Sequence, residues 1–177
     1  SWGWTDLVTN KEYVLMGLDD GTAFIDISDP VSPIFIGKLP TATEPSVWRD
    51  IKVYNNHAFI VSEAPNHGIQ VFDLTRLRGL QLAQTFDADR VINSIPTAHN
   101  MVVNQDSGYG FVVGTDLNGI YAGGVHFLNL NNLQGAISEG GFADAGYSHD
   151  AQVVTYSGPD PDYQGREIFL GSNEDRL

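Results

Sequence analysis

The sequence contains no cysteine among its 177 residues. This absence excludes disulfide bonds, thiolate metal sites and a cysteine nucleophile, although a cysteine-free chain folds equally well inside and outside the cell. No apolar run approaches the roughly 20 residues that a membrane-spanning helix requires, so we expect no transmembrane segment. Basic residues are few, with 9 Lys and Arg against 22 Asp and Glu and a net charge of −13. Nucleic acid is therefore not an expected partner, because its binding requires a basic surface.

Several catalytic and cofactor motifs are also missing. There is no Gly-x-Ser-x-Gly sequence for a serine nucleophile. The glycines between 119 and 124 match neither of the common phosphate-binding motifs. The expected cofactors therefore include neither a nucleotide nor a haem. No segment shows sustained helical periodicity, and the only short helical candidate is 74–79.

A short polar group followed by apolar β-forming residues recurs along the chain. It reads Trp48-Arg49-Asp50, then Ala98-His99-Asn100, then Ser148-His149-Asp150, at intervals of 50 residues. A weaker copy, Trp4-Thr5-Asp6, lies 44 residues before Trp48. Recurrence at this interval is typical of a repeat architecture.

Short apolar strands separated by turn residues follow each polar group. Asp20-Gly21 predicts a tight hairpin, because these residues adopt the positive φ angles that such a turn requires. One strand of each set has a similar pattern, at 24–27, 71–74 and 127–130. Four-stranded sets that repeat about every 45 to 50 residues are typical of the blades of a β-propeller. A β-sandwich also uses short strands, but it does not explain why the sets resemble one another.

We therefore predict an all-β chain, a single partial β-propeller domain with about three and a half four-stranded antiparallel blades. The predicted blades span about residues 1–45, 46–95, 96–145 and, incompletely, 146–177. Residues 80–86 are the predicted fourth strand of the second blade, and an outer strand of the third is expected near 136–142. A closed propeller needs roughly 4 to 8 blades, so we expect the rest of a longer chain, or another chain, to complete the ring.

The segment from Phe24 to Pro30 (Phe-Ile-Asp-Ile-Ser-Asp-Pro) resembles the LVIVD repeat, in which an apolar strand ends in Asp and enters a Pro turn. The wider order of motifs resembles the choice-of-anchor B family of LVIVD-repeat proteins. The matching segments are Trp48 to Val53, His67 to Thr75, Ala98 to Asn100, Ser148 to Gln152 and Asp162 to Glu167. The resemblance implies a propeller fold and an extracellular, periplasmic or cell-surface location. It implies little about activity.

The repeated polar groups supply the main candidate site. If they start the innermost strands, Asp6, Asp50, Asn100 and Asp150 occupy equivalent places on one rim of the channel. His99 and His149 would then be neighbours, and Arg49 would be their equivalent in the preceding blade. These residues could simply tie blades together by hydrogen bonds. Alternatively, His99, His149 and Asp150 could hold a divalent metal, and the catalytic candidates would be His99, His149, Asp50, Asp150 and Arg49.

A second candidate is the loop that carries Asp160, Asp162 and Glu167. It loosely resembles a calcium loop, although its spacing is not that of an EF-hand, and a plain turn capped by Asp is the alternative. His57, His67 and His126 are not expected to be ligands. His126 lies inside a predicted strand, and His67 lies in a turn beside Gly68, where it could be exposed.

Three functions remain open from the sequence. The first is a non-enzymatic binding or scaffold module that presents loops to a protein or glycan partner and binds Ca²⁺ or another divalent metal. The second is a metal-dependent enzyme with a His/Asp site at the mouth of the channel. The third is a subunit of a surface assembly that other chains complete.

Overall fold

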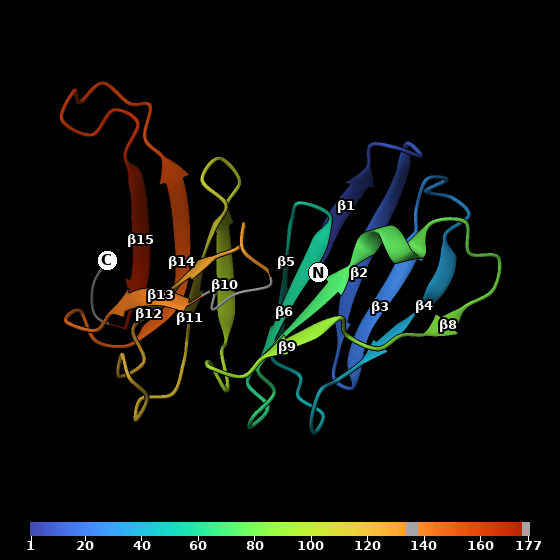
Figure 1. Cartoon of the computed structure of the whole chain (residues 1–177), viewed down its shortest axis with the longest axis horizontal. Coiled ribbons are helices and arrows are strands. Elements are labelled where there is room, and N and C mark those ends of the chain that lie inside the picture. Colours follow the sequence, from blue (N-terminus) through green and yellow to red (C-terminus); the bar gives the residue numbers. More distant parts are fainter. Residues whose placement is uncertain (134–137, 175–177) are drawn as a thin grey trace. The chain divides into compact units, whose positions relative to one another are not determined.

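The computed structural model describes residues 1–133 and 138–174. The chain forms two compact units, Ser1–Thr97 and Ala98–Leu177. Strands dominate both units (Figure 1), and the described residues include no α-helix, only a short 3₁₀ helix, η1 (Leu74–Leu77). The predicted all-β class is therefore confirmed. Across these same ranges, no helix is long and apolar enough to cross a membrane.

The first unit contains two sheets whose strands follow one another in chain order. The first sheet consists of β1 (Trp2–Asp6), β2 (Lys11–Leu18), β3 (Gly21–Asp26), β4 (Ile34–Pro40) and β8 (Gln84–Thr85). The second consists of β5 (Arg49–Tyr54), β6 (His57–Ser62), β7 (Ile69–Asp73) and β9 (Arg90–Ile92). Apart from the parallel β4–β8 pair, neighbouring strands are antiparallel.

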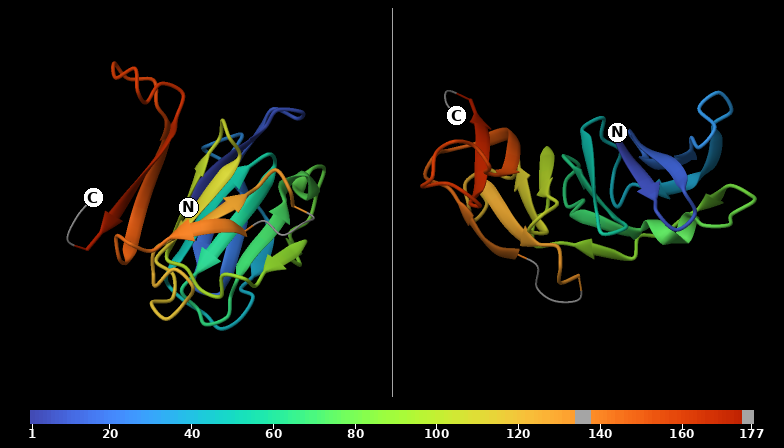
Figure 2. Two further views of the ribbon diagram at one scale, coloured as in Figure 1. Left: turned by 60° about the vertical axis from the view of Figure 1, so that its left-hand side comes forward. Right: turned by 90° about the horizontal axis from the view of Figure 1, so that it is seen from above.

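The second unit also contains two sheets (Figure 2), and all of their strand pairs are antiparallel. The larger consists of β10 (Asn100–Asn104), β11 (Tyr109–Val113), β12 (Val125–Asn129) and β13 (Ser138–Phe142). The smaller consists of β14 (Ser148–Thr155) and β15 (Glu167–Asn173). Within the described residues, β13 accounts for the expected outer strand near 136–142, and residues 136 and 137 lie outside the described ranges.

Local sequence explains the tight turns. The β5–β6 hairpin turns at Asn55 and Asn56, whose φ angles are 46° and 62°. Asparagine tolerates this left-handed region better than most residues, and two such angles in succession match the twist of a two-residue hairpin. The helical candidate at 74–79 forms η1, where the Asp73 side chain caps the helix by accepting a hydrogen bond from the backbone N–H of Thr75.

An aromatic cluster holds the two sheets of the first unit together. Phe24 on β3 stacks on Phe72 on β7 with ring centroids 4.7 Å apart, and Phe86 meets both rings edge-on. The three side chains are at most 5% exposed. Because burial of one phenylalanine contributes about 2 kcal/mol, this cluster is a main source of the unit's stability.

Polar contacts between neighbouring sheets join residues about one repeat apart. In the first unit, Trp4 donates its indole N–H to the Asn56 side chain, 52 residues away. In the second, the Asn104 amide donates to the Thr155 hydroxyl, 51 residues away. The first strands also contact each other, β1 with β5 and β10 with β14. Within each unit, each sheet therefore packs against the next through equivalent strands.

The prediction that 80–86 forms the fourth strand of the second set is wrong. Only Gln84–Thr85 form a strand there, and it pairs in parallel with β4 of the first sheet. The outer strand of the second sheet is instead β9. The backbone N–H of Phe86 donates to the Lys38 carbonyl at 2.8 Å. Since the Phe86 ring is also buried beside Phe24, the segment crosses to the first sheet.

Candidate functional site

The recurring polar groups lie at the start of the first strand in three sheets. Arg49 begins β5, Asn100 begins β10 and Ser148 begins β14. Asp6 instead ends β1, so its predicted equivalence to Asp50, Asn100 and Asp150 is wrong.

Asp6 is a buried anchor of the first unit. Its carboxylate is inaccessible to solvent and accepts two hydrogen bonds from the Arg78 guanidinium, both 2.8 Å long. It also accepts from the backbone N–H of Val8 and the hydroxyl of Thr9. The Arg78 guanidinium holds the pKa of Asp6 well below its ordinary value.

The structure brings His99 and His149 together, as their spacing of 50 residues predicts. The two imidazole rings stack with centroids 4.1 Å apart and planes inclined by 30°. His149 is exposed, and His99 is partly buried. Beside them, the Asn100 amide donates to the Asp150 carboxylate at 2.7 Å, so the next pair of repeat positions is also in contact.

Asp150 is the third predicted metal ligand. Its Oδ1 already accepts from Asn100 and from the backbone N–H of Ala151, each at 2.7 Å. It also lines a cavity of about 320 Å³ on β14 and β15, with Gln152 and Leu170 among the other lining residues. Over the ranges that the structure describes, no group of three or more His, Cys, Asp and Glu side chains could hold a metal ion.

Arg49 is held by neutral acceptors. Its Nε donates to the Leu18 carbonyl at 3.1 Å, and its Nη2 donates to the Thr41 hydroxyl at 2.8 Å. Its Nη1 lies 2.9 Å from Nε2 of His67. Because Nδ1 of His67 lies 2.8 Å from the Gly68 carbonyl, which can only accept, Nδ1 carries the proton and Nε2 accepts from Arg49.

Burial lowers the pKa of His67, and the Arg49 charge lowers it further. Burial also lowers the pKa of Arg49, against the opposing effect of Asp20 and Asp19. The pair is therefore a neutral imidazole bound to a cation, in which Arg49 keeps its charge and His67 has no free nitrogen for a ligand. Asp50, the next residue on β5, forms an ion pair with Lys52 at 2.5 Å.

Two of the loop residues proposed for calcium accept hydrogen bonds within the chain. Asp160 Oδ1 accepts from the backbone N–H of Asp162 at 3.0 Å, as in an Asp-capped turn. The Glu167 carboxylate instead accepts from the Asn104 amide at 2.7 Å and the Ser107 hydroxyl at 2.6 Å. In this conformation, Glu167 joins β15 to the β10–β11 hairpin.

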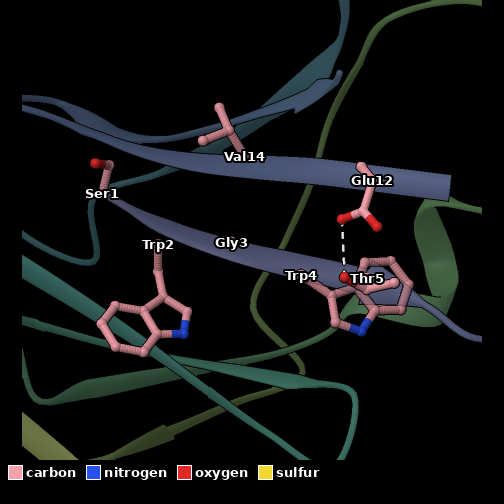
Figure 3. Close-up of a pocket in the computed structure, with 7 residues that line it drawn as sticks. All are labelled: Ser1, Trp2, Gly3, Trp4, Thr5, Glu12 and Val14. Atoms are coloured by element: carbon pink, nitrogen blue, oxygen red, sulfur yellow. Dashed lines mark hydrogen bonds between the residues drawn. The ribbon is translucent and has the colours of Figure 1, made fainter. Parts of the chain in front are cut away.

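An open hollow lies along β1 and the adjoining part of β2, on the strand face that carries Thr5 and Glu12, opposite the indoles of Trp2 and Trp4. Its volume is about 590 Å³, and its lining residues are Ser1, Trp2, Gly3, Trp4, Thr5, Glu12 and Val14. Figure 3 shows both indoles extending from β1, and the Thr5 hydroxyl donating to the Glu12 carboxylate at 2.8 Å. Trp4 is buried, whereas Trp2 is 40% exposed, and the ammonium of Lys52 lies 4.6 Å from the centroid of a Trp2 ring.

One feature of the site was not evident from the sequence. His67 was expected in a turn where it could be exposed, but its side chain is completely buried. His126 lies in a strand, β12, as expected; it is 6% exposed and packs edge-on against Tyr121 at 4.7 Å. A signal for His67 was available in the mostly apolar strand, β7, that begins two residues later.

No protein-family model, curated protein or solved structure matches this chain.

Proposed function

We propose that this chain is a non-enzymatic binding or scaffold module, a β-propeller segment of the LVIVD-repeat type that acts outside the cell or at its surface. The observation that supports it best is the repeat spacing of the contacts between sheets. Trp4–Asn56 and Asn104–Thr155 are separated by 52 and 51 residues. Rotation about a central axis places each strand beside its equivalent in the next blade, so the contacts recur with the period of the repeat. A β-sandwich imposes no such spacing.

The partner that the chemistry favours is a neutral glycan. Thr5 and Glu12 offer a hydroxyl and a carboxylate for sugar hydroxyls, and Val14 on the same strand face offers an apolar contact for the sugar ring. The net charge of −13 disfavours sulfated or otherwise anionic glycans. The hollow of about 590 Å³ falls in the usual size range of small-ligand sites.

Glycan-array binding by the full chain tests this proposal. The wild type should bind a subset of neutral glycans, and Glu12→Ala should remove that binding. Glu44→Ala is the matched control, because Glu44 is also an exposed glutamate of the first unit and lies outside the hollow. Absence of glycan binding by the wild type, or equal binding by Glu12→Ala, would count against the glycan proposal.

The second candidate is a metal-dependent enzyme, and the observation that favours it is the contact between His99 and His149. Imidazole nitrogens suit zinc and other transition metals, whereas carboxylates alone suit calcium. Metal content after dialysis against Zn²⁺ or Ca²⁺ separates the two functions. The binding module predicts no zinc that depends on the histidines. One zinc per chain, lost in the double variant His99→Gln/His149→Gln, would favour the enzyme instead.

A further inference from the structure

Two buried side-chain oxygens of the first unit have no hydrogen-bond partner. They are Oγ1 of Thr22 and Oε1 of Gln70. Thr22 is completely buried and Gln70 is 3% exposed. Buried polar atoms in native proteins are nearly always satisfied by protein groups or ordered water. The Gln70 side chain also lies close to the His67 ring. Nδ1 of His67 donates to the Gly68 carbonyl and Nε2 accepts from Arg49, so neither nitrogen can donate to Gln70 Oε1. The two oxygens therefore point to a bound molecule.

Both oxygens lie between the first and second sheets. Thr22 precedes Phe24 by two positions on β3, and Gln70 precedes Phe72 by two positions on β7, so each side chain lies on the same strand face as the stacked phenylalanine. The Gln70 amide nitrogen donates to the Pro40 carbonyl at 2.9 Å. Pro40 pairs with Gly21, next to Thr22, so the Gln70 side chain reaches the same end of β3.

The chemistry of the site defines what can occupy it. Because the Pro40 carbonyl requires a donor, the nitrogen of the Gln70 amide faces Pro40 and Oε1 faces away from it. An amide oxygen only accepts, so the bound molecule must donate a hydrogen bond, which excludes a simple anion. Arg49 lies close by through its bond to His67, and its charge disfavours a cation. A neutral donor of small size remains.

We propose that an ordered water molecule lies between the side chains of Thr22 and Gln70. It donates one hydrogen bond to Gln70 Oε1 and forms a second hydrogen bond with the Thr22 hydroxyl. The water joins β3 of the first sheet to β7 of the second. It lies beside the network in which Leu18, Thr41 and His67 hold Arg49. A group of hydrogen-bonded polar residues would thus extend from Arg49 to the proposed water. This water would lie in the interface between the two sheets, next to the Phe24–Phe72 stack.

A high-resolution crystal structure of the full chain tests the proposal directly. It should show one water within hydrogen-bond distance of both Thr22 Oγ1 and Gln70 Oε1. An empty space, or a direct hydrogen bond between the two side chains, would overturn it. This measurement does not depend on how well any variant folds.

A double-mutant cycle tests whether the two oxygens share one water. Urea unfolding is followed by tryptophan fluorescence, since Trp2, Trp4 and Trp48 all lie in the first unit. Thr22→Val and Gln70→Met should each raise the unfolding equilibrium constant by about tenfold, and the double variant by clearly less than the product. Thr22→Ser keeps the hydroxyl, so Gln70→Met should change the unfolding equilibrium constant by the same factor in this variant as in the wild type. Effects that simply multiply in the Thr22→Val/Gln70→Met variant would refute the shared site.

Discussion

The stack of Phe24 on Phe72 should be the most sensitive point of the first unit. Phe72 is completely buried, and its ring centroid lies 4.7 Å from that of Phe24 and 5.1 Å from that of Phe86. Replacing Phe72 by alanine leaves a cavity between the two sheets. Other contacts fix the distance between the sheets, so the sheets cannot move together to fill the cavity. Substitutions of this kind cost about 4 kcal/mol.

Tryptophan fluorescence during urea unfolding measures this loss, because it follows the first unit alone. For a unit of 97 residues we take a slope of about 1.5 kcal/mol per molar urea, and the midpoint should then fall by roughly 2.5 M. If Phe72→Ala is unfolded without urea, Phe72→Leu removes less volume and should give an intermediate shift.

Phe35→Ala is the matched control for this prediction. Phe35 is a phenylalanine of the same unit, but its side chain is 51% exposed. Its replacement should change the free energy of unfolding by no more than about 0.5 kcal/mol. Equal shifts for Phe72→Ala and Phe35→Ala would refute the reasoning that the two sheets are held together through this stack.

Two further predictions concern charge in the first unit. The pKa of His67 is lowered in the folded state, so the unfolded chain takes up a proton first as the pH falls below about 6.5. The unit should therefore be fully stable above that pH. Below it, the free energy of unfolding should fall by up to about 1.4 kcal/mol per pH unit. Urea unfolding at pH 7.5 and 5.5 checks this dependence, and its persistence in His67→Gln would contradict the assignment. Asp6→Asn removes the charge that binds Arg78 and should lower the urea midpoint, whereas Asp20→Asn, at an ion pair where the Asp side chain is 53% exposed, should leave it nearly unchanged. A midpoint for Asp6→Asn as high as that for Asp20→Asn would mean that the buried pair contributes little.

The sequence was sufficient for the fold class and for the contacts that depend on repetition. Alternating apolar residues and turn residues predicted most strands, because side chains on a strand alternate between its two faces. The spacing of 50 residues predicted that His99 and His149 would meet, and their rings do stack. A regular spacing can be read from the sequence alone, so contacts between residues one repeat apart can be predicted without coordinates.

Contacts that break the repeat could not be predicted in the same way. Residues 80–86 have the composition of a strand, but Phe86 completes an aromatic cluster with two rings from different sheets. His67 precedes β7 in a turn, a position that suggests exposure, but it is buried and its Nε2 contacts Arg49. Both depend on partners that are distant in the chain and unique to one repeat.

The candidate site shows the same division. The proximity of the two histidines could be predicted from the repeat. The hydrogen-bond partners of Asp150, Glu167 and Arg49 could not, because they depend on side-chain conformation. A carboxylate in a sequence motif can bind a metal or accept hydrogen bonds from neighbouring amides and hydroxyls, and the motif does not distinguish the two. Glu167 illustrates this, because it accepts from Asn104 and Ser107.

The central claim, that the sheets are successive blades around one axis, can be tested by a spin-label distance measurement. Because the chain has no cysteine, label pairs can be introduced without removing native thiols. The labels go into the first hairpin turn of successive sheets, at Val8, Asn55 and Gln105, all of which are exposed. A propeller predicts that the Asn55–Gln105 distance equals the Val8–Asn55 distance, because each blade is related to the next by the same rotation. An Asn55–Gln105 distance much longer than the Val8–Asn55 distance would contradict the propeller.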